Sequence, residues 1–74
     1  MTIKPLTGKV ILEKARGKGL PINEGPVGWK AAASYLASKY SKEPVSLREV
    51  ADKFNVTQIT VLIKFRELIS ALRL

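Results

Sequence analysis

The residues best equipped for chemistry lie between positions 46 and 66, where hydroxyl, amide and basic side chains recur at helical spacing. Thr57, Gln58 and Thr60 stand at the predicted start of a helix, and their side chains can hydrogen-bond nucleobase edges or phosphates. The free backbone N–H groups of a helix start also favour phosphate. The chemistry expected here is therefore recognition of a polyanion, without making or breaking covalent bonds.

The same segment has the pattern of a helix-turn-helix. Ala51 is small enough to let two helices cross closely, and Asn55 tolerates the left-handed conformation of a tight turn. Val50, Val56 and Val61 are expected to fill the angle between the helices. In such motifs the second helix enters the major groove, with residues near its N-terminus at the base edges. A plain helical corner that never contacts DNA is the alternative.

Basic side chains accompany the motif. Arg48, Lys53, Lys64 and Arg66 lie in it or beside it, and as phosphate contacts they would give affinity without sequence information. For some of them a solvated position on a helix face is the alternative.

One side of the predicted recognition helix is aliphatic. With Val61 at the centre of the buried stripe and about 100° per residue, Ile59 and Ile63 point away from the core. Leu62 lies at the margin of that stripe. Thymine methyl groups, a partner protein or another segment of a longer molecule are all compatible with such a surface. Contact with DNA and contact with protein both stay open at these three positions.

The residue inventory excludes most catalytic and metal chemistry. The chain has no His and no Cys, so it can form no zinc finger, Cys–His nucleophile or Ser–His–Asp triad. Glu49 and Asp52 share a helix face at i, i+3, but without further ligands they make no convincing metal or acid–base pair. We therefore predict no enzyme activity, no metal and no cofactor.

Length and composition favour one small binding domain. The 74 residues are 46% hydrophobic, which allows a packed core without disulfides. The 13 Lys+Arg against 6 Asp+Glu give a net charge of +7, which favours nucleic acid over a membrane surface as partner. No stretch approaches the roughly 20 apolar residues of a membrane span, and residues 1–6 lack the features of a signal peptide. An intracellular, cytoplasmic location is expected.

Apolar periodicity and capping residues predict one all-α domain over residues 1–74, without strands or repeats. Its four helices are expected at about residues 7–17, 26–41, 46–54 and 57–72, with residues 1–6 extended or flexible. Thr7 and Thr57 are good N-caps, and Ser46 with Glu49 makes a capping box. Two helices carry long inward-facing stripes, namely Trp29, Ala33, Leu36 and Tyr40 in the second and Val61, Phe65, Leu68 and Leu72 in the fourth.

Several short motifs occur in a specific order between about residues 9 and 69. They are ILEKAR at 11–16, GL at 19–20, GPxG at 25–28, AAAxYxAS at 31–38, REVA at 48–51 and VTxxTV at 56–61, followed by Phe65 and Glu67-Leu68. Together they resemble the second cyclin-like repeat, the C-terminal core domain, of archaeal transcription initiation factor B, the relative of eukaryotic transcription factor IIB.

This resemblance implies a five-helix cyclin-like fold whose last two helices form the helix-turn-helix. This chain is expected to contain four of the five helices, so it would be a truncated repeat without the first helix. The resemblance also implies that the domain binds promoter DNA upstream of the TATA box and acts together with the TATA-binding protein to orient RNA polymerase. Ile59 and Thr60 match recognition-helix positions of the family, and Ser46 with Arg48 matches the start of the preceding helix. The predicted DNA-binding residues are Ser46, Arg48, Lys53, Thr57, Gln58, Ile59, Thr60, Leu62, Ile63, Lys64 and Arg66.

Two positions depart from the family pattern. Leu62 stands where the family typically carries an arginine that is a principal base reader, and Ile63 replaces its polar successor. The resemblance therefore implies an inherited scaffold and leaves base-specific recognition open. Only one repeat is matched, without the zinc ribbon, the linker and the first repeat, as expected of an excised fragment or a reduced relative.

The predicted function is a non-enzymatic DNA-binding domain of the transcription factor B type, contacting promoter duplex through residues 46–66. One alternative is a protein-interaction or homodimerisation module that uses Ile59, Leu62 and Ile63. Another is a stand-alone helix-turn-helix regulator, which would bind a palindromic operator as a two-fold dimer.

Overall fold

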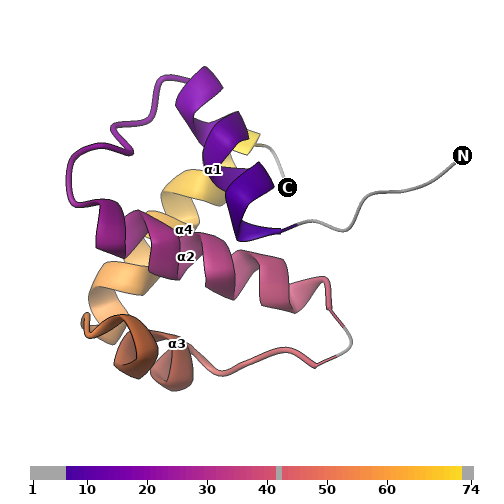
Figure 1. Ribbon diagram of the computed structural model, residues 1–74, viewed down its shortest axis with the longest axis vertical. Helices are drawn as coiled ribbons and strands as arrows, with labels where there is room; N and C mark the ends of the chain where they lie inside the picture. The colour runs from indigo at the N-terminus through magenta and orange to yellow at the C-terminus, as the bar shows by residue number, and fades with distance from the viewer. Residues whose placement is uncertain (1–6, 42, 73–74) are drawn as a thin grey trace, which may run out of the picture.

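The structure, a computed structural model, describes residues 7–41 and 43–72 (Figure 1). Its helices are α1 (Gly8–Gly17), α2 (Pro26–Lys39), α3 (Leu47–Phe54) and α4 (Gln58–Leu72), and no strand occurs in the described ranges. The predicted all-α class is confirmed, and the arrangement is consistent with a cyclin-like repeat. The prediction for residues 1–6 lies outside the described residues.

Local sequence explains where the first two helices begin. The Thr7 hydroxyl accepts a hydrogen bond from the Val10 N–H at 3.3 Å, which satisfies one of the free donors at the start of α1. α2 begins at Pro26, whose missing N–H costs nothing at that position. Gly25, just before it, has φ 68°, a left-handed conformation that glycine adopts without strain.

α2 is the central helix. It contacts each of the other three helices, and α4 also contacts α1 and α3, whereas α1 and α3 as described do not touch each other. In Figure 1, α1 lies on one side of α2 and α3 on the other, with α4 crossing behind. The run of three alanines at 31–33 in α2 explains this close packing, because small side chains let neighbouring helices approach.

The buried side chains form two clusters on different faces of α2. The larger cluster joins α1, α2, α4 and the loop before α2, and comprises Ile11, Ala15, Ile22, Trp29, Ala32, Ala33, Leu36 and Leu68. The smaller cluster lies between α2, α3 and α4, and comprises Ala31, Val50, Ala51 and Val61. Ile22 is only 5% exposed although it lies in a segment that the sequence predicts as loop.

The predicted inward stripe of the second helix is wrong at its end. Tyr40 is 59% exposed, because α2 ends at Lys39 and not near residue 41. The Tyr40 N–H donates to the Ala37 carbonyl at 3.1 Å and the Ser41 hydroxyl donates to the Ser38 carbonyl at 2.7 Å. These bonds close a turn that takes Tyr40 out of the helical register. In α4 the stripe is as predicted, with Val61 and Leu68 fully buried.

Candidate nucleic-acid interface

The turn between α3 and α4 is a compact, hydrogen-bonded structure. Asn55 has φ 55° and ψ 46°, so the predicted left-handed residue is present. The Asn55 N–H donates to the Asp52 carbonyl at 3.2 Å, and the Val56 N–H reaches back to the Ala51 carbonyl at 2.9 Å. These bonds satisfy the last carbonyls of α3 and set the direction in which the chain enters α4.

Small and branched side chains fill the angle between the two helices, as the sequence predicts. Val50 and Ala51 are 3% and 2% exposed and Val61 is fully buried. Ala31 of α2 belongs to the same cluster and lies beneath the pair. The relative position of α3 and α4 is therefore fixed by packing on a third helix, as a helix-turn-helix requires.

Both helices of the motif begin at a capping hydroxyl. The Ser46 hydroxyl accepts from the Glu49 N–H at 3.1 Å, which is one half of the predicted capping box. The Thr57 hydroxyl accepts from the Thr60 N–H at 3.1 Å and lies 2.8 Å from the Thr60 hydroxyl. These bonds leave N–H groups of each first turn without intrahelical partners, and a helix start in this state favours anions.

The predicted contact residues differ in exposure. Ile59 is 70% and Ile63 is 53% exposed, so the aliphatic outer side inferred from helical spacing exists. Leu62, placed by the sequence at the margin of the core, is half-buried. The exposed polar candidates are Ser46, Arg48, Lys53, Thr57, Gln58 and Arg66.

Two candidates, Thr60 and Lys64, lie on the flank of α4 that faces α2. A Cβ added to Gly28 would stand 3.2 Å from the Thr60 methyl group, so backbone and side chain meet closely there. The Lys64 ammonium lies 4.7 Å from the centre of the Trp29 ring, within the range of a cation–π interaction. Sequence reasoning missed that Gly28 and Trp29 support the start of α4. The sequence does offer one signal of this contact, because a glycine in the first turn of a helix allows a neighbouring helix to approach closely.

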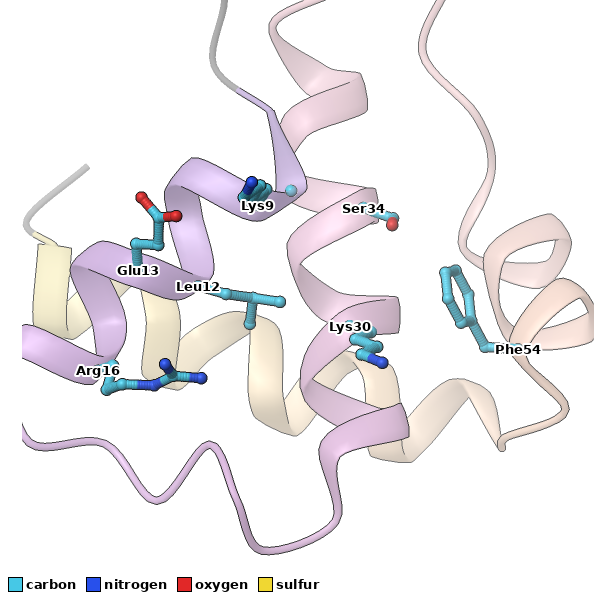
Figure 2. Close-up of a pocket in the computed structure, with 8 residues that line it drawn as sticks. Lys9, Leu12, Glu13, Arg16, Lys30, Ser34 and Phe54 are labelled. Atoms are coloured by element: carbon cyan, nitrogen blue, oxygen red, sulfur yellow. The ribbon is translucent and has the colours of Figure 1, made fainter.

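Neither a metal-binding cluster nor a membrane-spanning helix occurs among the described residues. They contain no group of three or more His, Cys, Asp or Glu side chains that could hold a metal ion. None of the described helices is long and apolar enough to cross a membrane. A hollow of about 480 Å³ lies away from the helix-turn-helix starts, between α1 and α2 with Phe54 at its far side (Figure 2). Among the described residues that line it, Glu13 is the only one with a carboxylate side chain.

Comparison with known proteins gives one consistent result. The chain is 39% identical over 62 residues to transcription initiation factor IIB of Methanopyrus kandleri, which covers 84% of this chain and 20% of that protein. It is 42% identical over 64 residues to transcription initiation factor IIB 1 of Thermococcus kodakarensis (86% and 21%). The protein of the same name from Methanococcus aeolicus is 45% identical over 58 residues (78% and 17%).

No protein-family model matches the chain, and no solved structure matches it. The relatives bear the name of an initiation factor and not of an enzyme, in agreement with the prediction of a non-enzymatic protein. The chain spans about a fifth of the length of these relatives. Over most of its own length, it is therefore a homologue of transcription initiation factor IIB, matching a fragment with the cyclin-like repeat of that family.

Proposed function

We propose that the chain is a non-enzymatic DNA-binding domain of a transcription initiation factor, and that it holds promoter duplex upstream of the TATA box through residues 46–66. The observation that carries the proposal is the pair of capped helix starts, at Ser46 and Thr57, on a helix-turn-helix whose angle is fixed by the buried Val50, Ala51 and Val61. The TATA-binding protein and RNA polymerase are the partners proposed for the assembled complex, and its location is intracellular.

Affinity in this proposal comes mainly from phosphates. Arg48, Lys53 and Arg66 are exposed on the motif and would neutralise backbone charge, and the two helix starts would donate N–H groups. Thr57 and Gln58 would contact the groove. The Lys64 ammonium lies over Trp29, so we assign it chiefly to holding α4 against α2. The net charge of +7 supports the same partner.

Fluorescence anisotropy with a promoter duplex and a scrambled duplex of equal length, at several salt concentrations, tests the proposal. Each neutralised phosphate should steepen the slope of log K against log salt by about 0.9. Undetectable binding at low salt, or binding that salt does not change, would refute DNA binding by this domain.

A matched pair of substitutions locates the contact. Thr57→Asp keeps an N-capping oxygen but places a negative charge where a phosphate is proposed, and should weaken duplex binding about tenfold. Thr7→Asp makes the same change of charge at the cap of α1, outside the motif, and should leave affinity within about twofold. Equal losses in both variants would mean that net charge alone drives binding.

The exposed Ile59 and Ile63 favour a second candidate function, a protein-interaction or homodimerisation surface on α4. In that case, sedimentation across protein concentrations would show self-association, and Ile59→Lys with Ile63→Lys would abolish it. If the chain is strictly monomeric at all concentrations, the homodimerisation hypothesis is excluded. The hypothesis of a stand-alone regulator that binds a palindromic operator as a dimer is then excluded as well.

A further inference from the structure

The last residue of α2 is a lysine whose ammonium lies against two aromatic rings. The Lys39 Nζ is 4.6 Å from the centre of the Tyr35 ring and 5.7 Å from the centre of the Phe65 ring. Both distances are within the range of a cation–π interaction. The two rings meet edge to face, with their centres 4.9 Å apart. Because Tyr35 belongs to α2 and Phe65 to α4, the Lys39 ammonium lies at the junction of these two helices.

The backbone of Lys39 is held near the start of α3. The neighbouring Ser38 hydroxyl donates to the Tyr35 carbonyl at 2.8 Å and accepts from the Val45 N–H at 3.4 Å. Val45 directly precedes Ser46, the N-cap of α3. This hydroxyl therefore ties the end of α2 to the segment that enters α3, which is the first half of the proposed DNA interface.

The ammonium of Lys39 lies beside the second half of that interface. Leu62 precedes Phe65 by three residues, so the two lie on the same side of α4. Arg66 follows Phe65 directly and is exposed. Lys39 thus stands between the start of α3 and the middle of α4, although it belongs to neither helix. Sequence spacing alone does not show this position, because Phe65 is 26 residues further along the chain.

Exposure separates Lys39 from Lys64, whose ammonium also lies over a ring. Lys64 is half-buried and covers Trp29, which is fully buried, so its charge is turned toward the core. Lys39 is exposed and covers rings that are themselves only half-buried. An ammonium group has three N–H donors, and rings on one side leave donors free toward solvent. Lys39 can therefore bind an anion without leaving its aromatic contacts.

We infer that Lys39 is a phosphate contact of this domain outside the helix-turn-helix, and that Tyr35 and Phe65 are positioning residues that hold its ammonium in place. The inference rests on the proposed function, because it requires duplex DNA to lie across the start of α3 and along α4. A lysine that is already held loses less side-chain freedom on binding, which favours affinity. A phosphate contact carries no sequence information, so its effect should be the same on every duplex.

Fluorescence anisotropy with the promoter duplex and the scrambled duplex tests the contact in the full chain. Lys39→Gln should reduce the magnitude of the slope of log K against log salt by about 0.9. It should weaken binding of both duplexes equally, by about threefold at low salt. Lys39→Arg keeps the charge and should keep the slope. Lys14→Gln is the matched control, because Lys14 is exposed on α1, and it should change the slope by less than about 0.3.

A double-mutant cycle tests the role of the rings. Phe65→Leu removes one ring and keeps an apolar side chain. It should weaken duplex binding about twofold when Lys39 is present and have no effect in the Lys39→Gln chain. Tyr35→Phe keeps the other ring and should leave binding unchanged. Circular dichroism checks that each variant is folded.

Two results would overturn the inference and leave the proposed function intact. One is duplex binding that Thr57→Asp weakens and Lys39→Gln does not. The other is an equal change of slope in Lys39→Gln and Lys14→Gln, which would mean that both lysines act only through net charge. An equal loss from Phe65→Leu in both backgrounds would overturn the positioning role of the ring. If the unsubstituted chain binds neither duplex at low salt, the proposed function and the inference are both refuted.

Discussion

The contact between Gly28 and Thr60 joins the central helix to the proposed recognition helix, and its strength can be measured. Gly28 is buried in the first turn of α2 and has an ordinary helical φ, so alanine fits the backbone there. In a helix, Gly→Ala is worth up to about 1 kcal/mol of stability. The new Cβ, however, would stand 3.2 Å from the Thr60 methyl carbon, and such overpacking costs about 1–3 kcal/mol.

We therefore expect Gly28→Ala alone to lower the free energy of unfolding by about 1 kcal/mol. Thr60→Ser removes the methyl group and keeps the hydroxyl that lies 2.8 Å from Thr57. In that background Gly28→Ala should instead raise the free energy of unfolding by up to about 1 kcal/mol. The coupling energy of the double-mutant cycle should then reach about 1–2 kcal/mol.

Urea unfolding followed by far-UV circular dichroism gives the four free energies of the cycle. Gly17→Ala serves as control, because it adds the same methyl group near the end of α1, where nothing lies within 4 Å. Its effect should be small and equal in both backgrounds. A coupling energy below about 0.3 kcal/mol between Gly28→Ala and Thr60→Ser would refute the close approach of α2 and α4.

Three further predictions concern the motif. Asn55→Ala should lower the free energy of unfolding by about 1 kcal/mol and Asn55→Gly should not, because Asn55 has φ 55°; chemical denaturation of both variants measures the difference. Lys64→Gln should lower the free energy of unfolding by about 0.5–1 kcal/mol through the lost interaction with Trp29, and it should leave the slope of log K against log salt for duplex binding unchanged. Arg66→Gln should reduce the magnitude of that slope by about 0.9 and leave the free energy of unfolding unchanged. Leu62→Arg should strengthen duplex binding and steepen its salt dependence; a folded Leu62→Arg chain that no longer binds would instead put Leu62 against protein.

Most of the fold could be predicted because its signals are local. The Thr7 and Ser46 caps and the left-handed Asn55 each act within three or four residues of the chain, and the structure shows them in those roles. The prediction for Tyr40 is wrong although the bonds that decide its position are also local. Its apolar character and spacing fit the stripe, but hydrogen bonds of the following turn decide where α2 ends.

What the sequence could not supply is the pairing of distant residues. Helical spacing places Lys64 beside other basic residues and gives no sign that its ammonium lies over Trp29, which is 35 positions earlier in the chain. Ile22 shows the same limit, since a single apolar residue in a loop has no periodicity and is buried only because α1, α2 and α4 close over it. The hollow beside α1 and α2 is likewise a property of packing, since Leu12 and Phe54 line it from separate helices.

The aliphatic side of α4 limits what the proposed interface can read. Base edges in the major groove are hydrogen-bond donors and acceptors apart from the thymine methyl group. Covering them with Ile59 and Ile63 would strip their water without replacing its hydrogen bonds, at a cost of about 1–3 kcal/mol for each group left unpaired. Phosphate contacts from Arg48, Lys53 and Arg66 escape this cost, because they lie outside the groove. We therefore expect the proposed interface to bind duplex DNA chiefly through the phosphates of the DNA backbone. At Ile59 and Ile63 it should discriminate between sequences only weakly, through contact with thymine methyl groups. The difference in affinity between a promoter duplex and a scrambled duplex should then be far smaller than the difference in affinity between low and moderate salt.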